Sequence, residues 1–138
     1  MITKEFLKPQ SIVVVGGSED VQKPGGKVLK NLKDTRYPGK IYVVNPKANT
    51  IQGIPCFRSV EDIPRADVAI LAIPAGLCLS AVETLCSRKG TKGIIIFSAG
   101  FSEESEAGAA IENKIRETAD TYGATLIGPN CVGYMNGN

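Results

Sequence analysis

Five short apolar segments recur along this chain with helix-like segments between them, and this order limits the possible folds more than any other feature. The segments are Ser11–Val15, Lys40–Val44, Asp67–Ile73, Lys92–Phe97 and Ala124–Ile127. Strands with nearly continuous apolar runs are buried on both faces, as in parallel sheets covered by helices. Helical connections between such strands are right-handed crossovers. The sequence therefore predicts an α/β fold, a doubly wound parallel sheet of about five strands in three α-β-α layers.

Residues 1–138 are expected to form one domain, because the chain shows no internal linker, repeat or low-complexity tract. The expected helices are Gly25–Asp34, Ala75–Lys89 and Glu103–Tyr122, with a short strand over Gly53–Phe57 and a helical turn over Ser59–Ile63. In the second helix the apolar residues expected to face the sheet are Leu77, Ala81, Val82 and Leu85. Glycines at positions 90 and 123 are typical of helix C-termini.

Composition excludes several functional classes. The net charge of +2 is too small to indicate a nucleic-acid-binding surface. The longest apolar runs have the length of strands, too short to span a bilayer, so no membrane partner is expected. The first residues, Met1–Phe6, lack the apolar stretch of a signal peptide. We therefore expect a cytoplasmic protein.

The chain has four cysteines and no histidine, and no two cysteines form a Cys-x-x-Cys pair. A zinc site or a disulfide framework is therefore not expected, and we predict no metal. Cys78 and Cys86 lie eight residues apart on a predicted helix and are expected to be buried as small hydrophobic residues. Cys131 has no histidine to activate it as a nucleophile, so no catalytic residue is assigned.

The first strand runs into a glycine turn, Gly16-Gly17-Ser18. In doubly wound sheets ligands bind at the carboxyl ends of the strands. The strict dinucleotide fingerprint fails, because Ser18 and Val21 stand where it requires glycine. A longer loop instead leads to Gly25-Gly26 at the start of the first helix, whose backbone N–H groups are suited to a phosphate. The alternative is a plain turn that needs glycine for a positive φ.

The second strand ends in Asn45-Pro46-Lys47, where nicotinamide enzymes normally carry an acid that binds a free ribose hydroxyl. An amide and a cation favour a ribose that carries a phosphate. The ligand is thereby narrowed to molecules like NADP or coenzyme A (CoA). The alternative for Lys47 is an ordinary surface lysine.

Small residues follow the later strands, at Pro74-Ala75-Gly76 and Phe97-Ser98-Ala99-Gly100. They leave room for a flat group, and Ser98 offers a hydroxyl donor; tight packing at strand-to-helix turns explains them equally well. After the last strand, Asn130 and the amides that follow it are placed to surround a reacting carbonyl.

Taken together, these motifs resemble the N-terminal CoA-binding domain of the NDP-forming (ADP-forming) acyl-CoA synthetases, a family related to the α subunit of succinyl-CoA synthetase. The resemblance extends over nearly the whole chain. Its motifs include Gly39–Lys47, Ser59–Pro64, Ala72–Ala75, Ser98–Phe101 and Gly128–Gly133. It implies a Rossmann-like domain that binds CoA at the carboxyl ends of its strands.

The resemblance also implies roles for individual residues. Gly17, Ser18 and Glu19 would line the nucleotide end, and Lys47 would meet the CoA phosphates. The residues implied to flank the adenine and pantetheine are Pro74, Ala75, Phe97, Ser98 and Ala99. Asn130 and Cys131 would lie near the thiol.

The family forms a thioester from an acid, CoA and a nucleoside triphosphate through a phosphorylated histidine. This chain contains no histidine. The resemblance therefore implies phosphohistidine and ATP-grasp partners, as domains or subunits, and a segment that binds CoA without turnover on its own. An NADP-dependent oxidoreductase domain and a stand-alone CoA or nucleotide sensor remain open as alternatives.

Overall fold

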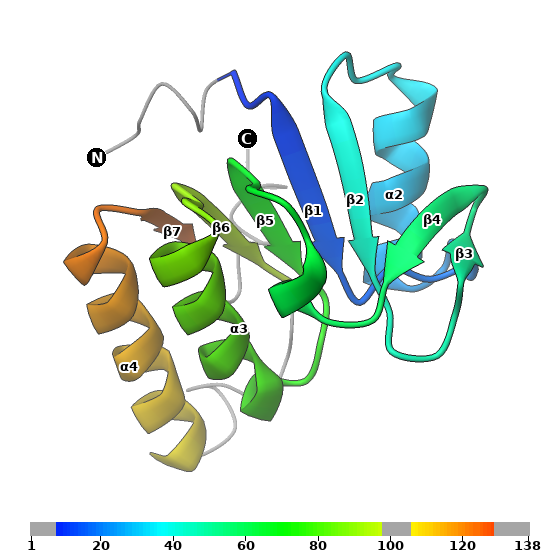
Figure 1. Ribbon diagram of the computed structural model, residues 1–138. Helices are drawn as coiled ribbons and strands as arrows, with labels where there is room; N and C mark the ends of the chain where they lie inside the picture. The colour runs from blue at the N-terminus through cyan, green and yellow to red at the C-terminus, as the bar shows by residue number, and fades with distance from the viewer. Residues whose placement is uncertain (1–7, 98–105, 129–138) are drawn as a thin grey trace.

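The computed structural model describes residues 8–97 and 106–128, which form a seven-stranded sheet with helices on both faces (Figure 1). The strands are β1 (Ser11–Val15), β2 (Lys40–Val44), β3 (Thr50–Ile51), β4 (Ile54–Phe57), β5 (Val68–Leu71), β6 (Gly93–Ile96) and β7 (Thr125–Ile127). The helices are α2 (Pro24–Asp34), α3 (Ala75–Arg88) and α4 (Glu106–Thr121), with a 3-10 turn η1 (Val60–Asp62).

The strand order is β3-β4-β2-β1-β5-β6-β7, and every neighbouring pair from β4 to β7 is parallel. At the centre, Val14 of β1 is level with Val43 of β2 and Ile70 of β5. The chain leaves β1 toward β2 on one side and later returns to β5 on the other. The predicted doubly wound parallel sheet is therefore confirmed, and its carboxyl ends share one edge.

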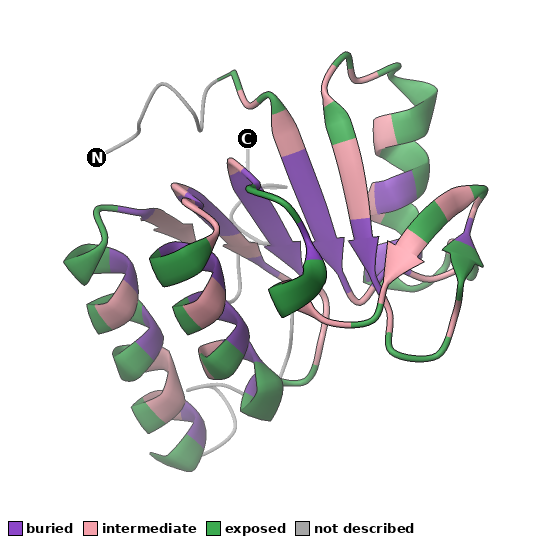
Figure 2. Ribbon diagram, viewed as in Figure 1, coloured by how far each residue is buried: buried purple, intermediate pink, exposed green. Residues whose placement is uncertain are grey.

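The three layers follow from the alternation of side chains along β1. Val13 and Val15 belong to the cluster beneath α3 and α4, whereas Ile12 and Val14 belong to clusters that include residues of α2. Successive residues of a strand point to opposite faces of the sheet, so α2 lies across the sheet from α3 and α4. Figure 2 shows the central strands buried and the outer helix surfaces exposed.

The described edge of the sheet beside β4 has one strand more than expected. Thr50–Ile51 pairs antiparallel with β4 through the turn Gln52-Gly53, where both residues have positive φ. Consecutive positive φ angles are typical of the two-residue turns that join hairpin strands. A two-residue strand has no apolar period of its own, which is why the sequence did not reveal it.

The prediction that Leu77 faces the sheet is wrong, because its side chain is 59% exposed. Cys78 lies against the core instead, one position later, on the same face as Ala81, Val82 and Leu85. The spacing from Cys78 to Leu85 is two helical turns, and Leu77 falls outside that face. Both Cys78 and Cys86 are buried as expected. No helix in residues 8–97 or 106–128 has the length and apolar character needed to cross a membrane.

Candidate functional site: the carboxyl edge of the sheet

The parallel pairing brings the predicted strand-end motifs to one edge. Gly16 follows β1, Asn45 follows β2 and Ala72 follows β5, and these three strands are neighbours. The strand order reverses between β1 and β5, since the chain passes from β1 to β2 on one side of the sheet and from β5 to β6 on the other. Such a switch point is where open α/β sheets bind ligands.

The glycine turn is shaped by close backbone approaches. Gly16 has a φ of +94° and donates from its N–H to the Val44 carbonyl at 3.0 Å. A Cβ atom on Gly25 would overlap the Gly16 carbonyl, and one on Gly26 would overlap the Asp20 carbonyl. The close packing of helix against strand, which the dinucleotide fingerprint assigns to its third glycine, is therefore provided here by Gly25 after a longer loop, and Gly26 packs against that loop.

Two side-chain amides hold successive carbonyls of this loop. Asn45 Nδ2 donates to the Gly17 carbonyl at 3.1 Å, and Gln52 Nε2 donates to the Ser18 carbonyl at 2.9 Å. In a planar trans peptide the N–H points away from the carbonyl. The N–H groups of Ser18 and Glu19 therefore point away from these amides, and neither donates to a described residue. Successive free N–H groups of this kind form an anion-binding concavity.

The loop ends at an uncapped helix N-terminus. Lys23 occupies the cap position of α2 and provides no side-chain hydrogen bond, and Pro24 is the first helical residue. The first turn of α2 contains no acidic side chain. Because Pro24 has no N–H, the first N–H groups of α2 are those of Gly25 and Gly26, at the positive end of the helix dipole, which favours an anion.

Asn45 is engaged with the chain rather than held out for a ribose. Besides its bond to Gly17, its Oδ1 accepts from the N–H groups of Lys47 and Ala48, at 2.8 and 3.1 Å. This Asx turn fixes the backbone of Lys47 at the edge. The Lys47 side chain is exposed, and its ammonium has no hydrogen-bond or ion-pair partner among the described residues.

Arg58 is a second cation at this edge that the sequence analysis missed. It directly follows β4, and its guanidinium donates to the Pro46 carbonyl at 3.1 Å and to Asn49 Oδ1 at 2.9 Å. Arg58 is thus attached to the loop that carries Lys47. Its position after a short strand was the available signal, because β4 is parallel to β2 and ends at the same edge.

The other predicted site residues are placed as follows. Glu19 is exposed, and its Oε2 accepts from the N–H of Gln52 at 3.0 Å, so its carboxylate contacts the hairpin turn. Pro74 is exposed at the cap position of α3, and Ala75 is buried beneath it. Phe97 is half-buried and packs on the α2 face of the sheet. Ser98, Ala99, Asn130 and Cys131 lie outside the described residues.

The Cys56 thiol, which lies on β4 at the described part of this edge, is not activated as a nucleophile. Burial raises the pKa of the Cys56 thiol on β4, and the Glu19 charge raises it further. No described cluster of acids, cysteines or histidines has the composition of a metal site. What the edge offers is backbone donors, a helix N-terminus and two cations, a set suited to binding a phosphorylated ligand.

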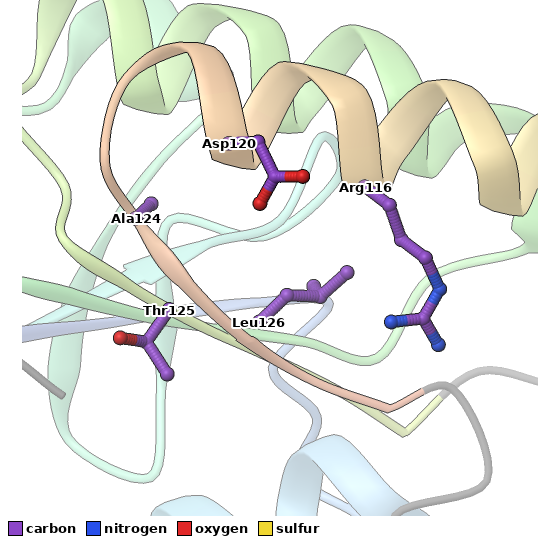
Figure 3. Close-up of a pocket in the computed structure, with 5 residues that line it drawn as sticks. All are labelled: Arg116, Asp120, Ala124, Thr125 and Leu126. Carbon is purple, nitrogen blue, oxygen red and sulfur yellow. The ribbon is translucent and has the colours of Figure 1, made fainter. Parts of the chain in front are cut away.

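A hollow of about 260 Å³ lies elsewhere, between α4 and β7 (Figure 3). Arg116 and Asp120 project from the helix, and Ala124, Thr125 and Leu126 line the strand side. Thr125 is level with Gly93, the first residue of β6. The hollow therefore opens near the amino ends of the strands, away from the candidate site.

Comparison with known proteins identifies relatives of the same fold. The sequence profile of the family described as CoA binding domain matches residues 10–137. Acetate–CoA ligase (ADP-forming) II of Archaeoglobus fulgidus is 42% identical over 134 residues, which cover 96% of this chain and 20% of that protein. Acetate–CoA ligase (ADP-forming) II subunit alpha of Pyrococcus furiosus is 42% identical over 132 residues, covering 95% of this chain and 28% of that subunit.

A solved structure agrees with these relatives. The dinucleotide forming acetyl-coenzyme A synthetase 1 of Candidatus Korarchaeum cryptofilum, in complex with phosphate and ADP, superposes with a TM-score of 0.82 at 33% identity. The match covers 94% of this chain and 28% of that one, so this chain spans less than a third of the length of each of these three relatives. The chain therefore belongs to the family of CoA binding domains and matches the part of the ADP-forming acyl-CoA synthetases that carries this domain.

Proposed function

We propose that this chain binds CoA at the carboxyl edge of its sheet and supplies CoA to an NDP-forming acyl-CoA synthetase. The observation that carries the proposal is the loop after β1, where Asn45 and Gln52 hold the Gly17 and Ser18 carbonyls and leave the next N–H groups without described acceptors. Those donors and the uncapped start of α2 suit the pyrophosphate of CoA.

The ribose phosphate of CoA distinguishes it from most adenine nucleotides. Lys47, on the fixed turn after β2, is the cation assigned to that phosphate. A charge-assisted bond to phosphate is stronger than a neutral one, so Lys47 would favour CoA over dephospho-CoA. The pantetheine would run past Pro74, Ala75, Phe97, Ser98 and Ala99, and the thiol would lie near Asn130 and Cys131.

In the complete reaction, an acid, CoA and a nucleoside triphosphate give acyl-CoA, nucleoside diphosphate and phosphate. The phosphohistidine step is assigned to other domains or subunits because this chain contains no histidine. Binding of the nucleoside triphosphate is assigned to the ATP-grasp partner that the family resemblance implies. Its own contribution is to bind CoA and orient the thiol. The relatives named above are synthetases several times longer than this chain or subunits of them, which supports this division of labour.

Calorimetric titration of the chain with CoA, dephospho-CoA, NADPH and NADH tests the proposal. We expect CoA to bind, dephospho-CoA to bind more weakly, and NADH to bind negligibly. A preference for NADPH over CoA would favour the alternative of an oxidoreductase domain and reject the proposal. If the chain binds CoA but does not stimulate acyl-CoA formation by the synthetase partners of the same cell, that result would favour a stand-alone sensor.

A further inference from the structure

Gln52 makes four hydrogen bonds from the turn between β3 and β4. Its Nε2 donates to the Ser18 carbonyl at 2.9 Å and to the Gly26 carbonyl at 3.0 Å. Its backbone N–H donates to Glu19 Oε2, and its own carbonyl accepts from Lys33 Nζ. One residue thus joins the hairpin to the glycine loop and to both ends of α2.

The backbone of Gln52 indicates that its side chain is required there. Its φ is +50°, a left-handed conformation in which glycine and asparagine are favoured and most other residues are strained. A glutamine keeps this strained backbone conformation only where contacts with the surrounding structure hold it in place. The two bonds from Nε2 use both donors of the side-chain amide, and they reach residues 34 and 26 positions away along the chain.

These bonds fix the direction of the loop. Gln52 holds the Ser18 carbonyl from the hairpin side, so the N–H of Glu19 in the same peptide unit points to the opposite side. The second bond attaches the same amide to the first turn of α2. Gln52 therefore sets the spacing between the free N–H groups of the loop and the helix N-terminus, the two donor groups assigned to one pyrophosphate.

We propose that Gln52 is a positioning residue for CoA: it touches no ligand and sets CoA affinity by holding the glycine loop against α2. This inference rests on the proposed function of the same edge. Because the loop otherwise has to be ordered when the ligand binds, its prior fixation lowers the cost of binding. The hairpin added to the edge of the sheet thereby has a function.

The test compares two Gln52 variants with a control on the same turn. Gln52→Gly removes both side-chain bonds and relieves the strain of the positive φ. Gln52→Asn keeps a residue that tolerates positive φ but shortens the side chain by one methylene group. Lys33→Met removes the bond from the end of α2 to the Gln52 carbonyl without touching the glycine loop. CoA affinity is measured by calorimetry well below the unfolding temperature, and amide hydrogen exchange of residues 17–26 is measured without ligand.

We expect Gln52→Gly to weaken CoA binding about tenfold, as for two lost hydrogen bonds of ordinary strength, and to accelerate exchange across residues 17–26. Gln52→Asn is expected to lose part of the affinity, and it decides the matter if Gln52→Gly does not fold. Lys33→Met is expected to bind CoA like the wild type.

Several results overturn the role of Gln52. A folded Gln52 variant that binds CoA with wild-type affinity overturns it, even if the melting temperature of the variant falls, because that pattern shows a structural role alone. An equal loss in Lys33→Met does so as well, because the effect would then belong to the hairpin as a whole. Absence of CoA binding by the wild-type chain overturns the proposed function together with this inference, so the two failures are distinguishable.

Discussion

Gly25 and Gly16 are in backbone contact, so that a Cβ atom on Gly25 would overlap the Gly16 carbonyl oxygen. The first turn of α2 is thereby seated directly on the end of β1. This contact puts the helix N-terminus beside the N–H groups of Ser18 and Glu19, which have no acceptor among the described residues. Backbone geometry, rather than a special side chain, brings together the donors on which the proposed CoA site depends.

Gly25→Ala is therefore expected to lower both stability and CoA affinity. The added methyl group forces helix and strand apart, and overpacking of this kind costs about 1–3 kcal/mol in unfolding free energy. Urea denaturation and CoA titration measure the two effects. Gly76→Ala is the matched control, because a Cβ there meets no atom within 4 Å; in helix α3 it should leave stability unchanged or raise it by up to about 1 kcal/mol. Equal stability of the two variants would contradict the account.

Lys47→Ala is expected to weaken CoA binding by about 1–3 kcal/mol, the loss typical of a charge-assisted hydrogen bond. The loss should be much smaller for dephospho-CoA, because the phosphate assigned to Lys47 is then missing. Lys40→Ala provides the control, since Lys40 is exposed at the start of β2, whereas Lys47 lies beyond its carboxyl end. Calorimetry with CoA and with dephospho-CoA measures both losses of affinity. An equal loss for the two ligands would show that Lys47 does not bind the ribose phosphate.

Thr91→Val is expected to lower the free energy of unfolding by about 1–3 kcal/mol, the cost of leaving a buried group without its hydrogen bond. The fully buried Thr91 hydroxyl donates to the Ala66 carbonyl at 2.8 Å. Valine keeps the shape but removes the donor. Thr91→Ser keeps the donor and loses one methyl group, so it should be the milder change in urea denaturation. The reverse order would show that packing, rather than this bond, dominates.

Stability should fall as the pH rises from about 9 to about 11, in part because of Cys86. Burial raises the pKa of this thiol from its ordinary 9.0 to about 11, against a smaller lowering by the Lys92 charge. In this pH range the unfolded chain releases the thiol proton while the folded chain retains it, so stability decreases with pH. Urea denaturation at pH 8 and pH 10.5 should show a smaller decrease in Cys86→Ala than in the wild type. An identical decrease would mean that Cys86 titrates normally in the fold.

The central sheet could be predicted from sequence because its strands are nearly continuous apolar runs and two of its helices, α3 and α4, end at glycines. Gly90 and Gly123 both have positive φ, as expected of such helix ends. The position of the Asn45-Pro46-Lys47 turn at the same edge of the sheet as the glycine turn followed from the parallel topology. These features are local in sequence or fixed by parallel topology, and a sequence pattern records both.

The missed features depend on contacts between distant residues. The carbonyls held by Asn45 and Gln52 lie 28 and 34 residues away along the chain, and no periodicity signals such bonds. Asn45 stands where nicotinamide enzymes carry an acid that binds ribose, so the sequence pattern predicts a contact with the ribose. In the structure its amide instead holds the Gly17 carbonyl. The helical pattern places Leu77 on the core face of α3 beside Ala81, Val82 and Leu85, but Cys78, also predicted to be buried, occupies that face instead.

The most direct test of the site is a map of backbone amide chemical shifts in the labelled chain during titration with CoA. We predict that the largest changes fall on Gly17, Ser18 and Glu19, on the first turn of α2 and on Lys47, with little change around Arg116 and Thr125. Changes centred on the hollow between α4 and β7, with the glycine loop unaffected, would contradict this prediction.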